Sequence, residues 1–458
     1  MVFFFLYGGW GRGYGGGMVT IPVQTKIVRP GGFDGGVVRV PGDKSISHRT
    51  ALLAGISAGT SEIHGFLLAE DCLNTLKAME SFGARSWVAE EGVVSIQGTG
   101  GKMLEPVGPL DVGNSGTGMR LLAGLCAGQP IQVTLTGDAS LNSRPMRRIQ
   151  EPLERMGARV ELSAEGTAPM TIRGGQLHGI EYCLPAASAQ VKSCCILAGL
   201  YATGRTTVLE PIPTRDHTER MLRAVGAPIR VEGPHISVEG YGPAGPKFQA
   251  RRYVVPGDFS SAAYWLAAAA AIPGVVLRAE GIGLNLRRTA LLDVLRRMGA
   301  RVDIQRMSDP GDPEVYGNVT VHGGALTGTE VGGAEIPNLI DELPLVAVLG
   351  ALARGRTVIR DAAELRVKES DRVAVMSENL AGMGVHVTEQ PDGMIIEGPA
   401  ALSPTQSIRS HGDHRVAMSM SILAIFADAP VTIANVACVD TSYPEFWEQL
   451  ANLGVNVE

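Results

Sequence analysis

Two patterns of hydrophobic and polar positions each recur six times along the chain. The first is an amphipathic helix that ends in a bulky apolar residue, a glycine and a short side chain, followed by a strand. A glycine at this place is typical of the left-handed residue that closes a helix. These glycines stand at positions 83, 157, 226, 299, 384 and 454, roughly 70–85 residues apart. That interval is too long for a solenoid repeat and fits a βαβαββ unit.

The second pattern is a helix that is apolar on nearly every side and runs through a turn into a β-branched strand. A helix of this kind has to be buried all round. Six such helices beside six amphipathic ones predict an α/β fold of six units, three in each of two domains, around buried helices. A basic strand before Pro-Gly-Asp at 256–258 marks the expected break between the domains. The buried copies are 51–63, 122–133, 196–208, 266–277, 346–359 and 421–433.

A polar motif stands directly before each buried helix, and the most informative one is Pro-Gly-Asp-Lys-Ser-Ile-Ser-His-Arg at 41–49. It predicts a strand, a tight turn and a helix start that is capped by Asp43 or Ser45. The free N–H groups and the dipole of a helix start favour an anion, and Lys44 and Arg49 add positive charge. If the six helix starts open on facing surfaces, they form a cleft suited to a polyanionic substrate. The remaining motifs are 114–120, 188–190, 258–261, 341–342 and 413–415.

Composition excludes several classes of protein. With 458 residues, 45% hydrophobic and 19% charged, the chain is a globular protein of more than one domain and is not disordered. A formal net charge of -6 argues against a nucleic-acid partner. The six cysteines contain no C-x-x-C pair, so we expect reduced, buried thiols in a cytoplasmic protein.

The N-terminus is unusual, because an aromatic run is followed by glycine-rich sequence. It lacks the basic region and the cleavage site of a signal peptide, and no segment of the chain predicts a membrane span. We therefore expect residues 1–17 to be a non-native or disordered extension, Met18 to be the initiator, and the protein to have no membrane partner.

Five motifs, in order, resemble the signatures of the enolpyruvyl transferases. They are the segment 41–49, Gly-Asn-Ser-Gly-Thr-Gly-Met-Arg at 113–120, Ser-Arg-Pro-Met at 143–146, Arg-Val-Lys-Glu-Ser-Asp-Arg at 366–372 and Gly-Asp-His-Arg at 412–415. Within that family the chain is most similar to the branch that acts on shikimate 3-phosphate, in its class II form. The resemblance runs from about residue 30 to the C-terminus and implies a two-domain inside-out α/β barrel with the active site between the domains. The implied domains are 43–255 and, completed by the N-terminal strand, 18–42 with 256–458.

The resemblance also implies the reaction. The enolpyruvyl group of phosphoenolpyruvate would pass to the 5-hydroxyl of shikimate 3-phosphate through a tetrahedral ketal, with release of phosphate. No metal and no cofactor would be needed, the protein would be a monomer, and glyphosate would bind at the phosphoenolpyruvate site.

The family's functional residues carry over to matching positions of this chain. Asp341 would be the base for the 5-hydroxyl, Glu369 the acid for C3 of phosphoenolpyruvate, and Lys44 would contact both substrates. Shikimate 3-phosphate would be bound by Lys44, Ser45, Arg49, Ser188, Ala189, Gln190, Arg215, Asp341 and Lys368. Phosphoenolpyruvate would be bound by Lys44, Asn114, Gly116, Arg144, Gln190, Arg372 and Arg415.

Simpler interpretations of several residues stay open at the level of sequence. Asp341 and Glu342 could be an ordinary helix cap and first-turn acid, and Arg372 could be a solvated cation paired with Glu369 or Asp371. We interpret His48 and His414 as structural hydrogen-bonding groups and Asp258 as a cap.

Departures from the family pattern leave alternatives open as well. Thr441 stands where many members have lysine, so one phosphoenolpyruvate cation is missing or comes from elsewhere. Gly116 favours sensitivity to glyphosate, although Leu121 replaces a common proline nearby. A UDP-N-acetylglucosamine enolpyruvyl transferase would have asparagine and cysteine where this chain has Ser45 and Ala139. An RNA 3′-phosphate cyclase-like protein would need a basic track, and an inactive homologue is the third alternative.

Overall fold

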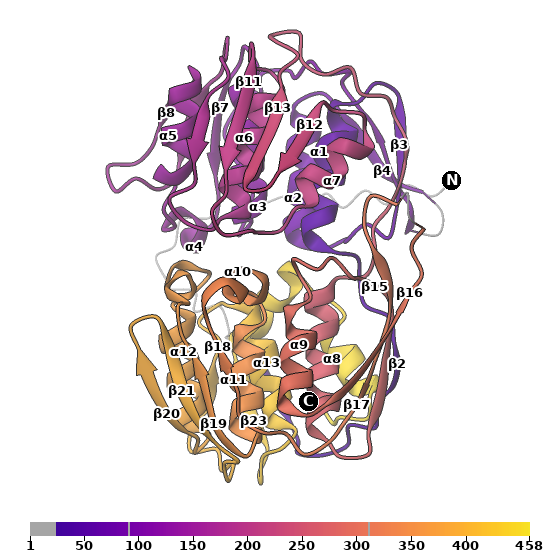
Figure 1. The fold of residues 1–458 in the computed structure, drawn as a ribbon, viewed down its shortest axis with the longest axis vertical. Helices are drawn as coiled ribbons and strands as arrows, with labels where there is room; N and C mark the ends of the chain where they lie inside the picture. The colour runs from indigo at the N-terminus through magenta and orange to yellow at the C-terminus, as the bar shows by residue number, and fades with distance from the viewer. Residues whose placement is uncertain (1–23, 90–91, 310–311) are drawn as a thin grey trace, which may run out of the picture.

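The computed structural model describes residues 24–89, 92–309 and 312–458. The predicted extension 1–17 and the expected initiator Met18 lie outside these ranges. The described chain forms two lobes stacked along the long axis of the molecule, each with strands around a group of helices (Figure 1).

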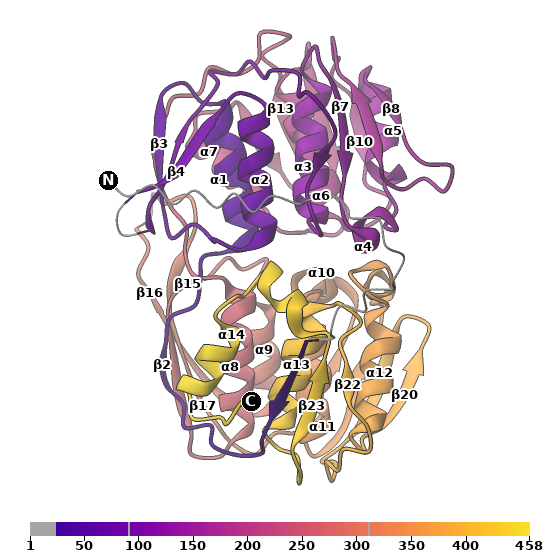
Figure 2. The same cartoon turned by 180° about the vertical axis from the view of Figure 1, so that it is seen from behind.

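The six predicted buried helices are confirmed, and each runs into a strand. They begin at the polar motifs, a few residues before the apolar stretches, because the cap residues and the first turn are polar. Seen from the other side of the molecule, the two groups of helices stand inside their lobes (Figure 2). The helix and strand pairs are α1 (Lys44–Ile56) with β3 (Thr60–His64), α3 (Gly116–Ala127) with β7 (Gln132–Thr136), α6 (Ala189–Gly199) with β11 (Arg205–Leu209), α8 (Phe259–Ala271) with β15 (Val276–Gly283), α11 (Leu343–Leu352) with β19 (Gly355–Ile359), and α13 (His414–Ala424) with β23 (Val431–Ala434).

The six amphipathic helices also form where the pattern predicts them. Each is followed within two residues by its glycine, and all six glycines have positive φ angles, from 79° at Gly226 to 111° at Gly157. The glycine ends the helix and turns the chain into the next strand. These helices are α2 (Glu70–Ser81), α5 (Arg147–Met156), α7 (His217–Ala224), α9 (Ala290–Met298), α12 (Arg372–Gly382) and α14 (Phe446–Asn452). Shorter helical segments are α4 (Ala139–Asn142), α10 (Ile336–Leu339), η2 (Gly333–Glu335), η3 (Ala363–Val367) and η4 (Val436–Thr441).

Each unit contributes one small mixed sheet. In the sheet of order β14-β3-β5-β4, the strand after the buried helix pairs in parallel with one neighbour and antiparallel with the other. The same arrangement recurs in β6-β7-β9-β8, β10-β11-β13-β12, β16-β17-β15-β2 and β18-β19-β21-β20, and a three-stranded version is β1-β23-β22. The remaining strands are β1 (Thr25–Val28), β2 (Gly36–Val38), β4 (Arg85–Val88), β5 (Val94–Gln97), β6 (Leu110–Asp111), β8 (Arg159–Glu161), β9 (Met170–Arg173), β10 (Glu181–Cys183), β12 (Ile229–Glu232), β13 (His235–Glu239), β14 (Arg252–Val254), β16 (Arg301–Arg306), β17 (Tyr316–His322), β18 (Glu330–Val331), β20 (His386–Gln390), β21 (Gly393–Gly398) and β22 (Ile408–Arg409).

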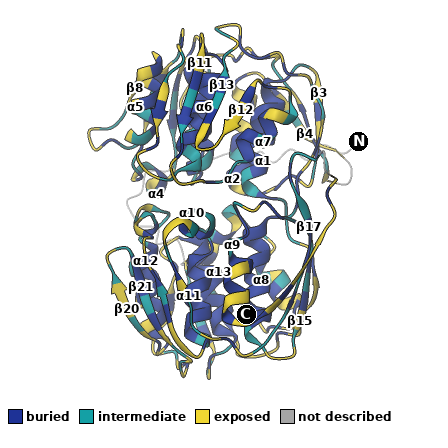
Figure 3. Ribbon diagram, in the orientation of Figure 1, coloured by how far each residue is buried: buried dark blue, intermediate teal, exposed yellow. Residues whose placement is uncertain are grey.

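The buried hydrophobic side chains form two separate clusters. One runs from Ile46 to Val255, and the other joins Val28, Phe33 and Val38 to residues 259–455. Burial is concentrated in the helices inside each lobe, while the strands and the amphipathic helices carry exposed positions as well as buried ones (Figure 3). This is the predicted inside-out α/β fold. We propose the boundaries 43–255 (the N-half) and 18–42 with 256–458 (the C-half) for the two domains, because the N-terminal strands β1 and β2 pair with strands of the C-half.

Two further observations concern the chain as a whole. All six cysteines are free. The prediction that they are buried is confirmed for four of them and wrong for Cys183, which is exposed because alternate residues of β10 face outward, and Cys438 is only half-buried. Among the described residues, no helix is both long and apolar enough to span a bilayer.

Candidate active site between the two halves

The starts of the buried helices meet at the seam between the halves. Asp43 caps α1 by accepting from the N–H of Ile46 at 2.9 Å, so the alternative cap Ser45 is not used. Asp258 caps α8 in the same way and also accepts from the main-chain N–H of Lys44, at 3.1 Å. The first helix of the N-half and the first helix of the C-half are thus joined at their N-termini. Ser115, Ser188 and Asp413 cap α3, α6 and α13.

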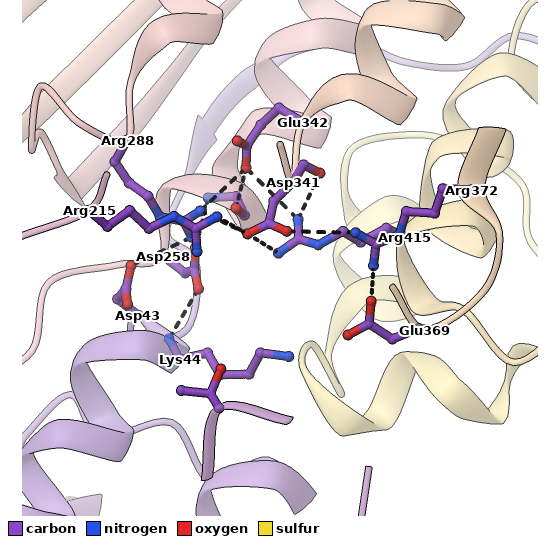
Figure 4. A network of polar contacts seen from close by, with 12 residues as sticks. Asp43, Lys44, Arg215, Asp258, Arg288, Asp341, Glu342, Glu369, Arg372 and Arg415 are labelled. Atoms are coloured by element: carbon purple, nitrogen blue, oxygen red, sulfur yellow. Dashed lines mark hydrogen bonds and ion pairs between the residues drawn. The ribbon is translucent and has the colours of Figure 1, made fainter. Parts of the chain in front are cut away.

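Asp341, just before α11, lies among four arginines (Figure 4). Arg215 of the N-half donates to its Oδ2, and Arg288 donates to the same atom at 3.3 Å. Arg415 donates to its main-chain oxygen at 3.1 Å, and Arg372 Nη1 lies 3.6 Å from its Oδ1. Burial would raise the pKa of this carboxyl, but the Arg215, Arg415 and Arg288 guanidiniums hold it well below its usual range. Asp341 is therefore an ionised acceptor.

Glu369 forms the second carboxylate centre, and it too joins the halves. Arg372 donates to its Oε2 at 2.5 Å, while Arg144 of the N-half donates to its Oε1 at 3.4 Å. Burial opposes ionisation, but Arg372 and Arg144 hold the pKa of Glu369 well below its ordinary value. Arg372 is itself held by Asp413, at 2.7 Å, and its side chain is 1% exposed.

Asn114 and Gly116 form the wall of this region in the N-half. The amide oxygen of Asn114 accepts from Arg144 at 2.5 Å. A Cβ added to Gly116 would lie 3.0 Å from Nη1 of Arg120 and 3.2 Å from Nη1 of Arg144, so the missing side chain leaves room at two guanidiniums.

Two arginines of the N-half, the buried Arg49 and the half-buried Arg120, have only neutral partners among the described contacts. Arg49 donates to the Thr218 and Ser193 hydroxyls and to the main chain of Ser45. Arg120 donates to the Gln190 side chain and to the carbonyl of Pro145. Burial lowers the pKa of each to about 10. A cation that is wholly or partly withdrawn from water and lacks a direct counter-ion is stabilised by an anion, so both arginines favour an anionic ligand.

Lys44 completes the cationic lining. Its ammonium lies 3.1 Å from Oδ2 of Asp71, whose own pKa is raised because burial outweighs this pairing. Lys368, next to Glu369, is half-buried; burial lowers its pKa, and nearby Asp341 opposes the change. In no part of the described chain do three or more His, Cys, Asp or Glu side chains gather as metal ligands would.

The structure therefore brings most of the predicted site residues to one seam. Ser45, Ser188, Ala189 and Gln190 lie at the starts of α1 and α6, with partly exposed side chains. Thr441, at the end of η4, donates its hydroxyl to the carbonyl of Cys438.

The structure supports some of the simpler interpretations of single residues and contradicts others. In one of them, Arg372 is a solvated cation paired with Glu369 or Asp371. It does pair with Glu369, but it is buried, because Asp413 and Glu369 enclose it. Glu342 occupies the cap position of α11 but makes no capping bond. His48 contacts the Thr75 and Ser115 hydroxyls as expected for a structural group. The hydrogen bond expected for His414 is not formed by its Nε2, which is buried and has no hydrogen-bond partner among the described residues.

Sequence reasoning missed three contributors: Asp71, Arg120 as a cation without a direct counter-ion among its described contacts, and Arg288. Arg120 stood inside a quoted motif, and its cationic role could have been inferred there. Arg288 had no usable signal, since two arginines stand side by side at 287–288 and only the fold buries one of them.

A set of arginines and carboxylates at the seam, placed by helix starts in two inside-out α/β halves, defines an enolpyruvyl transferase-type enzyme. The family described as EPSP synthase (3-phosphoshikimate 1-carboxyvinyltransferase) matches residues 29–450. The chain belongs to the EPSP synthase family, as the motifs predict.

Relatives and solved structures agree with this assignment. The 3-phosphoshikimate 1-carboxyvinyltransferase of Akkermansia muciniphila is 50% identical over 425 residues, which cover 91% of this chain and 97% of that protein. The enzyme of the same name from Alkalilimnicola ehrlichii is 48% identical over 93% of this chain and 95% of its own. An EPSP synthase structure from Acinetobacter baumannii superposes with a TM-score of 0.81 at 42% identity, covering 95% of this chain and all of that one. The enolpyruvyl transferase NikO from Streptomyces tendae, at 20% identity, 95% and 98% coverage and a TM-score of 0.77, shares the fold.

Proposed function

We propose that the chain transfers the enolpyruvyl group of phosphoenolpyruvate to the 5-hydroxyl of shikimate 3-phosphate and releases phosphate. The observation that carries this proposal is the pair of carboxylates, Asp341 and Glu369, each held between arginines of the two halves. The reaction needs a base, an acid and cations for two phosphates and two carboxylates. The seam provides all of them from side chains.

Asp341 accepts the proton of the 5-hydroxyl as that oxygen attacks C2 of phosphoenolpyruvate. Its depressed pKa suits this role, because a base has to be unprotonated before the reaction. Shikimate 3-phosphate is placed by Ser45, Arg49 and Arg215, with Lys368 beside Asp341. The hydroxyl and main-chain groups at the start of α6, from Ser188, Ala189 and Gln190, receive its phosphate, as a helix N-terminus favours.

Glu369 protonates C3 of phosphoenolpyruvate, and the resulting ketal then loses phosphate and returns the C3 proton. An acid has to be protonated first, whereas Arg144 and Arg372 favour the ionised form here. Both arginines are assigned to phosphoenolpyruvate. When they pair with its phosphate and carboxylate, less positive charge stabilises the Glu369 carboxylate, and its pKa rises toward the range of an acid.

The remaining cations complete the phosphoenolpyruvate pocket. Arg415 joins Arg144 and Arg372 as planar donors that suit bidentate contacts with phosphate and carboxylate. Lys44 stands between the two substrates, and Asn114, Gly116 and Gln190 line the wall. The same proposal has the protein act as a cytoplasmic monomer, with glyphosate competing for the phosphoenolpyruvate pocket.

Phosphate release tests this function directly. We expect release only when shikimate 3-phosphate and phosphoenolpyruvate are both present, and none when UDP-N-acetylglucosamine replaces the former. Glu369→Gln should lower kcat by about 10²–10⁴-fold while shikimate 3-phosphate still binds. Glu378→Gln, an exposed change on the following helix α12, is the matched control and should keep wild-type activity. Release that needs only one substrate, or survives Glu369→Gln unchanged, would refute the proposal.

A further inference from the structure

Arg288 is the one arginine around Asp341 that no substrate role explains. It stands on the loop between β15 and α9 and is 3% exposed. The other three arginines near Asp341, at positions 215, 372 and 415, are assigned to the substrates under the proposed function, on which this inference rests.

Both ends of the Arg288 guanidinium are occupied by carboxylates. Nη2 donates to Oδ1 of Asp258 at 3.1 Å and lies 3.9 Å from Oδ2 of Asp43. Nη1 donates to Oδ2 of Asp341 at 3.3 Å and lies 3.8 Å from Oε1 of Glu342. Asp258 and Asp43 cap the two helices whose starts meet at the seam, so Arg288 is tied to both helix starts.

Binding of two polyanions changes the surroundings of Asp341. Under the proposed function, the phosphates and carboxylates of the substrates pair with Arg215, Arg372 and Arg415, so the attraction of these three guanidiniums for Asp341 weakens. Arg288 is anchored by Asp258 and is buried, so its contact with Asp341 stays.

We propose that Arg288 is a positioning residue that keeps the Asp341 carboxylate oriented toward the substrate hydroxyl while the other arginines bind substrate. Its planar fork lets it hold Asp258 with one nitrogen and Asp341 with the other. A base held in this way needs no reorganisation when the hydroxyl arrives.

The charges that face this pair determine what a pH experiment will show. Arg288 is faced by four carboxylates, and Asp341 by four guanidiniums and the Lys368 ammonium. Loss of Arg288 removes one opposite charge within hydrogen-bond distance of Asp341, which raises the pKa of a carboxyl by about one to three units. The groups concerned are Asp43, Asp258, Asp341, Glu342, Arg215, Arg288, Arg372, Arg415 and Lys368.

The test is the pH profile of kcat in Arg288→Gln, with Arg287→Gln on the same loop as the matched control. We expect kcat at neutral pH to fall about 100-fold, and the acidic limb of the profile to move to higher pH by about one to three units. The KM values for both substrates should change less than about threefold. Arg287→Gln should leave the profile as it is in the wild type.

A purely structural role would lower the melting temperature without moving the acidic limb, and that result would overturn the proposal. If Arg288→Gln does not fold, Arg288→Lys decides: one ammonium cannot hold both carboxylates, so the limb should move in the same direction but less far, and an unmoved limb refutes the inference. Asp341→Asn separates this inference from the proposed function. If Asp341→Asn stays active, the base assignment fails; if it is inactive and neither Arg288 variant moves the limb, only the role of Arg288 fails. In the double variant Arg288→Gln with Asp341→Asn, we expect no further loss beyond Asp341→Asn alone.

Discussion

Replacing Lys192 by methionine should strongly destabilise the N-half. The Lys192 side chain on α6 is 0% exposed, and its ammonium lies 2.9 Å from Oε1 of Glu210 and 2.8 Å from Oε1 of Glu219. Methionine keeps most of the volume, so packing changes little. The two buried carboxylates lose the cation between them.

The size of the effect follows from two independent estimates. Removing one partner of a buried ion pair costs about 3–5 kcal/mol. The protein can instead protonate one glutamate, which at pH 7 costs about 3.7 kcal/mol for a group with an ordinary pKa of about 4.3. Both routes lead to a loss of roughly 3–5 kcal/mol, or a melting temperature lower by roughly 6–20 °C.

The pH dependence distinguishes this cause from a packing defect. In the variant, one buried glutamate without a counter-ion is expected to fold in its neutral form, so folding takes up a proton. The destabilisation should therefore shrink as the pH falls, to roughly 1 kcal/mol at pH 5. A cavity would cost the same at both pH values.

The assay is urea unfolding of the wild type and variants at pH 5 and pH 7. Lys77→Met, on the exposed face of α2, is the matched control and should stay within about 0.5 kcal/mol of the wild type. The triple change of Lys192→Met, Glu210→Gln and Glu219→Gln should recover most of the loss. A Lys192→Met loss below about 1 kcal/mol at pH 7, or one that is equal at pH 5, contradicts the reasoning.

The same substitution should affect substrate binding. Glu210 accepts a hydrogen bond from the hydroxyl of Thr214, the residue before Arg215. Glu219 follows Thr218, which accepts from Arg49 at 2.7 Å. Loss of the Lys192 pairing should therefore raise KM for shikimate 3-phosphate more than KM for phosphoenolpyruvate, since Arg49 and Arg215 are assigned to the former.

Three further predictions address the phosphoenolpyruvate site at Gly116, the buried His48 and the contact between the halves. Gly116→Ala places a methyl group 3.0–3.2 Å from the Arg120 and Arg144 guanidiniums, so KM for phosphoenolpyruvate should rise about tenfold; equal changes in both KM values would contradict this. Burial, with Lys44 and Arg49 nearby, lowers the pKa of His48 to about 3. The unfolded chain therefore binds a proton that the folded state excludes, and the free energy of unfolding should fall by about 1.4 kcal/mol per pH unit as the pH drops below about 6.5. His48→Gln should reduce that slope in urea unfolding, and an unchanged slope would argue against a neutral, buried His48. The pair of Arg148 and Glu364 joins the halves at 2.7 Å, but each side chain is 33% exposed. Glu364→Gln should therefore weaken the contact between the two halves by less than about 1 kcal/mol. Complete separation of the halves in solution scattering would show that this pair contributes far more.

Particular residues show how far sequence reasoning reached into the site. The cap of α1 was expected at Asp43 or Ser45, and Asp43 takes it. Asp258 was expected to be a cap only, yet it also pairs with Arg288, at 3.1 Å. A helix cap depends on residues a few positions apart, so the sequence predicts it. The ion pair joins groups 30 positions apart and depends on the path of the chain.

Local patterning by itself determined the six units, the buried helices and the polar motifs at their starts. The spacing of buried positions, the glycines that end helices and the helix caps all depend on residues within one or two helical turns. Such neighbours are close in sequence, so the sequence alone predicts these features. Only the tertiary structure decided which cations face which carboxylates. It placed Asp341 beside Arg215 and Glu369 beside Arg144, across the two halves. It also buried Arg288 among four carboxylates. Ion pairing depends on distance and desolvation in three dimensions, and residues far apart in sequence acquire both only when the two halves come together.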